Sequence, residues 1–200
     1  LVNNRRWEMK AVVPINRLKG RILGLVGFGN IAQGIVSKAR AFGIKTIAAD
    51  PYVSDEEFTK LDVERVDFDQ LLEQADFISI HTPLTDETTN LFGKEAFMQM
   101  KPEALLINTA RGPLVDIDAL AQALEAGEIA GAALDVLPQE PPPDDCPLFG
   151  RDDVILTPHT GFYSADALLD LQTTVAADVA SVLNGESPRF PVNPKVRDLK

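Results

Sequence analysis

Short apolar runs alternate with segments of helical spacing along most of the chain. Each apolar run ends at a residue such as Gly, Asp, His or Thr, which is typical of buried strands that finish at a turn. Strands are expected at 21–26, 46–49, 77–80, 104–107, 131–136 and 154–156, and helices at 31–42, 69–75, 94–100, 118–126 and about 165–183. This alternation predicts an α/β fold, a Rossmann-type doubly wound parallel sheet with helices on both faces.

Composition favours a folded globular protein and disfavours nucleic-acid and membrane partners. Hydrophobic residues make up 45% of the 200 residues, which is ordinary for a folded globular chain. The net charge of −11 disfavours nucleic acid and anionic membranes as partners, because both attract positive surfaces. No apolar run approaches the roughly 18 residues of a membrane span. The single cysteine, Cys146, cannot form an internal disulfide, which favours a reducing compartment, the cytoplasm.

A glycine-rich loop follows the first expected strand and opens the first expected helix. It runs from Gly27 through Gly29, Asn30 and Ile31 to Ala32, which is the G-x-G-x-x-G/A arrangement in its required context. The first glycine permits the turn, the second lets the backbone approach a pyrophosphate, and the helix N-terminus at Asn30 and Ile31 favours phosphate. The loop therefore predicts binding of a dinucleotide.

Asp50 ends the second expected strand, 18 residues beyond Ala32, where an acid would bind the adenosine ribose hydroxyls. Because a carboxylate repels a 2′-phosphate, NAD is predicted rather than NADP. In the alternative interpretation, the glycines serve packing alone and Asp50 caps a helix.

Further polar residues follow the carboxyl ends of later strands, where ligands bind in sheets of this type. Thr82 and Pro83 follow the strand at 77–80, and Arg111, Glu140 and His159 come after the next three strands. Taken singly, each charged residue has a plainer interpretation: a surface ion pair for Arg111 and one acid of a solvated loop for Glu140. The other histidine, His81, is interpreted as a partly buried structural residue.

Taken together, these motifs resemble a known family. The run from Asn108 through Arg111 to Gly112, then Asp135, Glu140-Pro141 and Pro158-His159, resembles the D-isomer-specific 2-hydroxyacid dehydrogenases, in the branch of the C-terminal-binding proteins and phosphoglycerate-dehydrogenase-like relatives. The intervals of 29 residues from Arg111 to Glu140 and of 19 from Glu140 to His159 look like those of the family. The resemblance covers residues 21–184.

The resemblance implies an NAD-dependent oxidoreductase that transfers a hydride between NAD(H) and a small D-2-hydroxy acid or 2-oxo acid. His159 would be the acid/base, because histidine titrates near neutrality. Glu140 would assist it, and Arg111 would orient the substrate. The further cofactor contacts that the resemblance implies are at Thr109, Ala110, Arg111, Asp135, His159 and Gly161. The reaction requires no metal.

The family also suggests how the chain is organised. Residues 1–20 would be a hinge or linker from an N-terminal substrate domain that is missing here, 21–185 the NAD-binding domain, and 186–200 a tail returning toward the substrate domain. The 200 residues alone would then turn over poorly. A homodimer is expected. The helix from Asp118 and the strand 129–134 are candidates for the dimer contact, although core packing explains them equally well.

Two other classes remain open. One is an NAD(H)-sensing, C-terminal-binding-protein-like dimer without enzymatic activity, against which Phe162 argues because co-repressors of that branch carry tryptophan there. The other is a methyltransferase, which has no need for Arg111, Glu140 and His159. The particular 2-hydroxy acid is not specified by the sequence.

Overall fold

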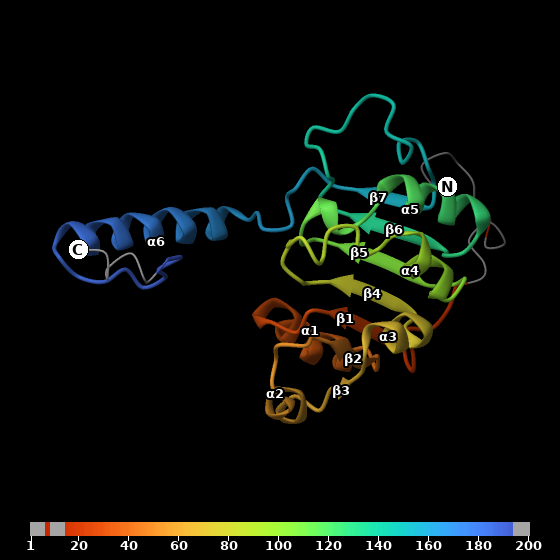
Figure 1. Ribbon diagram of the computed structural model, residues 1–200, viewed down its shortest axis with the longest axis horizontal. Coiled ribbons are helices and arrows are strands. Elements are labelled where there is room, and N and C mark those ends of the chain that lie inside the picture. The colour runs from red at the N-terminus through yellow and green to blue at the C-terminus, as the bar shows by residue number, and fades with distance from the viewer. Residues whose placement is uncertain (1–6, 9–14, 194–200) are drawn as a thin grey trace. The chain divides into compact units, whose positions relative to one another are not determined.

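The chain divides into two units, Leu1–His159 and Thr160–Lys200. The first unit is built on a single parallel sheet. The computed structural model describes residues 7–8 and 15–193. Within these residues the sheet has seven strands in the order β3-β2-β1-β4-β5-β6-β7 (Figure 1). The strands are β1 Ile22–Val26, β2 Lys45–Ala49, β3 Glu64–Arg65, β4 Phe77–Ile80, β5 Leu105–Asn108, β6 Gly131–Leu134 and β7 Val154–Leu156. This arrangement confirms the predicted Rossmann-type fold.

Some of the helices begin at a side chain that caps their first turn. The helices are α1 Asn30–Ala41, α2 Asp55–Lys60, α3 Phe68–Gln74, α4 Lys94–Gln99, α5 Ile117–Ala126 and, in the second unit, α6 Ala165–Leu183. Asp116 caps α5 by accepting from two backbone N–H groups of its first turn, and Gly127 ends the helix in the left-handed conformation. An acidic N-cap and a glycine in the left-handed conformation are common signals at the two ends of a helix. None of the helices in the described part of the chain is long and apolar enough to cross a membrane.

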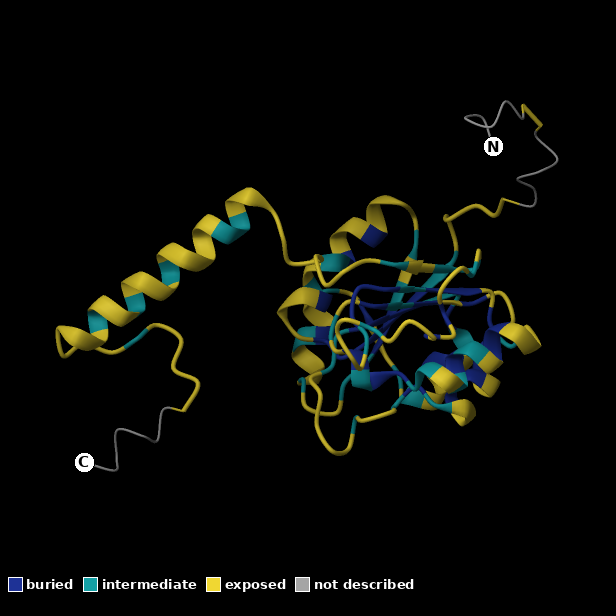
Figure 2. Cartoon of the chain, turned by 90° about the horizontal axis from the view of Figure 1, so that it is seen from above, coloured by how far each residue is buried: buried dark blue, intermediate teal, exposed yellow. Residues whose placement is uncertain are grey.

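Two hydrophobic cores lie on opposite faces of the sheet. Leu23 and Leu25 of β1 pack with α1 and α2, whereas Val26 joins the larger core with residues of α3, α4 and α5. Successive residues of a strand face opposite sides, so one strand serves both cores. In Figure 2 the strands of the first unit are largely buried. Helices therefore cover both faces, as predicted.

Core packing also accounts for the proposed dimer elements. Leu120 and Leu124 of α5, together with Ile129 and Leu134, are buried in the larger core. The apolar character of these residues is thus accounted for by the core and is not by itself a sign of a subunit contact.

Some boundaries differ from expectation. The strand expected at 131–136 ends at Leu134, because its pairing with β7 ends at Leu134 opposite Leu156. The sequence pattern predicted neither α2 nor β3. The two residues of β3 are both exposed and charged, so they carry no hydrophobic alternation.

Asp76 joins three segments at the amino ends of the strands. Its carboxylate accepts hydrogen bonds from the Ile22 N–H at 2.8 Å and from Arg21 and Lys101 at 3.2 Å each. Burial raises the pKa of Asp76, but these donors outweigh it and hold the pKa below its ordinary value. The ionised form thus stabilises the folded state.

Replacing Asp76 with asparagine is expected to remove acid-sensitive stability. A carboxyl whose folded pKa is depressed stabilises the protein above its unfolded pKa of about 3.9, and this contribution is lost as the pH falls through the folded pKa. The free energy of unfolding at neutral pH should drop by about 1–3 kcal/mol in Asp76→Asn, with a shallower decline below pH ~4. Urea unfolding across this range measures both effects. The exposed Asp86→Asn variant is the control, and equal acid sensitivity of wild type and Asp76→Asn would contradict the assignment.

Candidate cofactor site and active site

The strand order reverses between β1 and β4, which places a crevice at their carboxyl ends. A cavity of about 670 Å³ opens there. Gly27, Asp50, Thr82 and Pro83 line it, so the structure brings together four residues predicted from three separate strands.

Gly27 fixes the path of the glycine loop. Its φ is +87°, and a Cβ at this position would lie 2.7 Å from the carbonyl carbon of His81 and from the backbone nitrogen of Thr82. Both the conformation and the close approach exclude a side chain. The loop is thereby held against the end of β4.

Gly29 leaves space in front of α1. It is the N-cap residue without a side-chain cap, and a Cβ there would meet no atom within 4 Å. The first turn of α1, which includes Asn30 and Ile31, contains no acid. Unobstructed N–H groups and the positive end of the helix dipole suit a pyrophosphate. The residues present therefore fit the expected dinucleotide.

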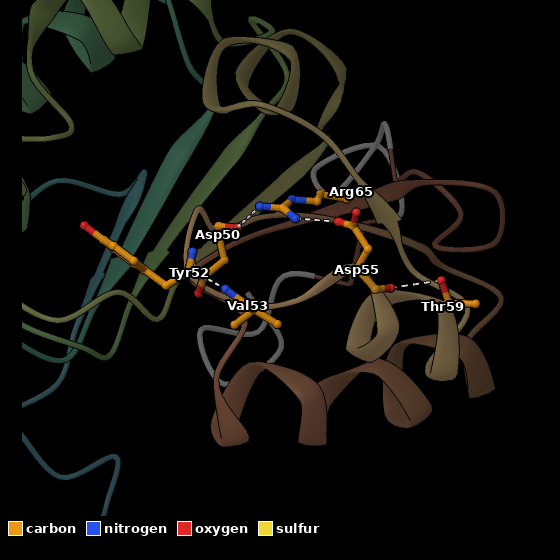
Figure 3. A network of polar contacts seen from close by, with 6 residues as sticks. All are labelled: Asp50, Tyr52, Val53, Asp55, Thr59 and Arg65. Atoms are coloured by element: carbon orange, nitrogen blue, oxygen red, sulfur yellow. Dashed lines mark hydrogen bonds and ion pairs between the residues drawn. The ribbon is translucent and has the colours of Figure 1, made fainter.

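Asp50 ties the glycine loop to the end of β2. One carboxylate oxygen accepts from the Phe28 N–H at 2.8 Å. The other accepts from the N–H groups of Tyr52 at 2.8 Å and Val53 at 3.2 Å (Figure 3). The following helix, α2, has Ser54 as its N-cap, so Asp50 is not a helix cap. Its position on the cavity wall suits the ribose interaction.

Glu140 and His159 form a hydrogen-bonded pair in the loops that follow β6 and β7. Nδ1 of His159 lies 2.7 Å from Oε2 of Glu140, and Oε1 accepts from the Leu137 N–H at 3.0 Å. The hydrogen bond with His159, aided by that from Leu137, lowers the pKa of Glu140. A second cavity, of about 390 Å³, is lined by both residues and by Asp135.

The backbone at His159 is strained. Its φ is +54°, a conformation that costs a non-glycine residue about 1–2 kcal/mol. The His159 N–H donates to the carbonyl oxygens of Asp135 at 2.8 Å and Thr157 at 3.0 Å, which holds the conformation. Such strain is concentrated at sites where a side chain must be placed for function.

Asp135 joins the ends of three strands. Its side chain is 7% exposed and accepts a hydrogen bond from the Thr157 hydroxyl, and its N–H donates to the Asn108 carbonyl at 2.9 Å. The end of β6 is thereby fixed between β5 and the segment carrying His159.

Asn108 shapes the loop that carries Arg111. The Asn108 side chain is fully buried; its amide donates to the Arg111 carbonyl at 2.9 Å and its oxygen accepts from the Ala110 N–H at 3.0 Å. Thr109 and Arg111 are exposed on this loop. The sequence pattern predicted no role for Asn108, although a buried asparagine at the end of a central strand is the type of residue that needs such partners.

Gly161 and His81, two other residues interpreted from the sequence pattern, do not line the two cavities described above. Gly161 belongs to the second unit, where it is exposed within the turn closed by the Tyr163 N–H and the Thr160 carbonyl at 2.9 Å. His81 is partly buried; its Nε2 lies 2.9 Å from Oγ of Ser79, and burial lowers its pKa.

A parallel sheet with a glycine loop, a helix N-terminus and an acid at the end of β2 defines a dinucleotide-binding domain. The sequence profile described as D-isomer specific 2-hydroxyacid dehydrogenase, NAD binding domain, matches residues 1–161, and the chain belongs to this family. The predicted family and its cofactor, NAD, are thereby confirmed.

Known proteins resemble the chain over most of its length. It is 43% identical over 188 residues to D-3-phosphoglycerate dehydrogenase of Methanocaldococcus jannaschii, covering 94% of this chain and 36% of that protein. It is 42% identical over 179 residues to glyoxylate reductase of Thermococcus litoralis, covering 90% and 54%. The crystal structure of D-lactate dehydrogenase with NAD⁺ from Lactobacillus jensenii has a TM-score of 0.86 at 33% identity, covering 96% of this chain and 61% of that one. The chain thus spans only part of the length of these relatives.

Proposed function

We propose that the intact protein is an NAD-dependent D-2-hydroxyacid dehydrogenase, reversibly reducing a small 2-oxo acid to the D-2-hydroxy acid. The observation that carries the proposal is the 2.7 Å pair between Nδ1 of His159 and Glu140, placed beside Asp135 at the carboxyl ends of the strands. A methyltransferase has no use for this pair.

His159 moves the proton in this reaction. When bound, NADH would supply the hydride for the carbonyl carbon of the 2-oxo acid. As negative charge builds on the carbonyl oxygen, His159 donates a proton to it, and in the reverse direction the imidazole takes the proton from the hydroxyl. Because Nδ1 is held by Glu140, we assign this transfer to Nε2. Glu140 also stabilises the imidazolium.

The other polar residues bind and orient. We assign Arg111 to the substrate carboxylate, whose two oxygens match the planar guanidinium. Buried Asp135 would accept a hydrogen bond from the nicotinamide amide, and Asp50 would accept hydrogen bonds from the ribose hydroxyls. The remaining proposed cofactor contacts within the first unit are Gly27, Gly29, Asn30, Ile31, Thr82, Pro83, Thr109 and Ala110.

The substrate class follows the relatives. Their names include D-3-phosphoglycerate dehydrogenase, glyoxylate reductase and hydroxypyruvate reductase at 42–43% identity. The shared part of these substrates is the 2-hydroxy or 2-oxo acid itself, which Arg111 and His159 would contact. We also propose a homodimer and, from the single Cys146, a cytoplasmic location.

Two measurements test this proposal. Fluorescence titration of the 200-residue chain should show micromolar NADH binding, about tenfold or more tighter than NADPH binding. The intact protein should oxidise NADH with at least one of glyoxylate, hydroxypyruvate or pyruvate. NADH binding with no turnover of any 2-oxo acid would instead favour the non-enzymatic, NAD(H)-sensing protein, and no NADH binding by a chain shown to be folded by circular dichroism would overturn the proposal.

A further inference from the structure

Arg65 lies on the wall of the cofactor cavity. It is the second residue of the edge strand β3, where it pairs in register with Ala48 of β2. It therefore lies beside the end of β2, and it lines the same cavity as Gly27 and Asp50. Nothing in the assigned site uses this cation.

Several contacts fix the guanidinium of Arg65 in place. Nη2 donates to the carbonyl oxygen of Asp50 at 3.0 Å, and Nη1 forms an ion pair with the Asp55 carboxylate (Figure 3). The guanidinium also lies 5.3 Å from the centre of the Phe58 ring, and Phe58 stacks on Phe28 of the glycine loop with 4.6 Å between ring centres. A planar group that is already ordered loses little conformational entropy when it binds a ligand.

The two charges beside the expected ribose act in opposite directions on a 2′-phosphate. The Asp50 carboxylate accepts hydrogen bonds from hydroxyl groups but repels a phosphate dianion. The guanidinium of Arg65 attracts that dianion and can donate two parallel hydrogen bonds to it. The expected preference for NAD over NADP therefore depends on the Asp50 carboxylate, which offsets the attraction between Arg65 and a 2′-phosphate.

We propose that Arg65 is a specificity-determining residue of the adenosine site, a preformed phosphate ligand whose effect Asp50 offsets. Removing the Asp50 charge lets the site accept a 2′-phosphorylated dinucleotide through Arg65. The inference rests on the NAD binding of the proposed function. It does not depend on the dehydrogenase reaction.

Three variants of the 200-residue chain separate the effects of the two residues on cofactor binding. Kd values for NADH and NADPH are measured by fluorescence titration in wild type, Asp50→Asn, Arg65→Gln and the double variant, with circular dichroism melts of each. Asp50→Asn should bind NADPH about tenfold more tightly than wild type does, and adding Arg65→Gln should remove most of this gain, since a charge-assisted phosphate contact is worth about tenfold. Asp50→Asn and the double variant should have the same Kd for NADH within about twofold, because Arg65 is assigned no contact with the ribose hydroxyls.

A control variant separates the effect of the Asp50 charge from that of the other carboxylate that contacts Arg65. Asp55→Asn, which removes the other partner of Arg65 but lies outside the cavity lining, should leave the preference for NADH in place. An equal NADPH gain with and without Arg65, or no gain in a folded Asp50→Asn variant, overturns the inference. If Asp50→Asn fails to fold, Arg65→Gln alone decides: it should weaken NADPH binding about fivefold more than NADH binding, and an equal effect on both overturns it. Failure of wild type to bind NADH would instead refute the proposed function.

Discussion

The His159→Gln variant of the intact protein is expected to reduce 2-oxo acids about a thousandfold more slowly than wild type. Glutamine can replace the imidazole in a hydrogen bond but cannot transfer a proton near neutral pH. The affinity for NADH should fall far less than the rate, by about tenfold at most, because His159 is one of several expected cofactor contacts and does not line the cavity that contains Gly27 and Asp50. Steady-state rates and NADH titration on the same sample measure the two effects. A loss of binding equal to the loss of rate would contradict an acid/base role.

Glu140→Gln provides the matched control, since it keeps the size of the side chain that contacts His159. Without the carboxylate, the imidazolium is less stabilised, so reduction should decline at a lower pH than in wild type. Oxidation of the hydroxy acid, which needs the neutral imidazole, should begin at a lower pH as well. An unshifted pH profile would show that the 2.7 Å pair does not act on the proton transfer.

The fold was largely predictable because its elements carry strong local signals. The core strands are apolar runs, and α5 has an acidic cap at Asp116 and a glycine end at Gly127. The edge strand β3 has only Glu64 and Arg65, both exposed, and its pairing with β2 is a tertiary interaction without a pattern in the sequence. The extent of such a strand depends on what it pairs with.

The residues of the site were found where a motif or the carboxyl end of a strand marked them. Asp50, Glu140 and His159 all follow predicted strands, and topology alone brings such positions to one edge of the sheet. Arg65 could not be found in this way, because the missing strand concealed its place beside Asp50. Asn108 was missed for another reason: it acts through backbone groups of Ala110 and Arg111, and the sequence does not show which loop a buried side chain holds.

A close contact between two backbones connects the loop of Arg111 to that of Glu140. Gly112 follows Arg111, and a Cβ on it would lie 2.0 Å from the Leu137 carbonyl carbon and 2.5 Å from the Pro138 nitrogen. The obstructing atoms are backbone, so a side chain cannot be accommodated by a rotamer change. Leu137 in turn donates its N–H to Glu140 at 3.0 Å. A displacement of the backbone at Gly112 would therefore move Leu137, whose N–H donates a hydrogen bond to the Glu140 carboxylate.

Gly112→Ala is accordingly expected to lower the free energy of unfolding by about 3 kcal/mol or more, the upper range for overpacking, with the midpoint of urea unfolding as the measurement. Two glycines of the same unit are matched controls, because a Cβ at either meets nothing within 4 Å. Gly34→Ala, inside α1, should stabilise the chain by about 0.5–1 kcal/mol, since alanine favours the helix. Gly29→Ala should leave stability nearly unchanged but weaken NADH binding, because its methyl group enters the space assigned to the pyrophosphate. If Gly112→Ala unfolded at the same urea concentration as wild type, the close approach of the Leu137 backbone to Gly112 would not constrain the two loops.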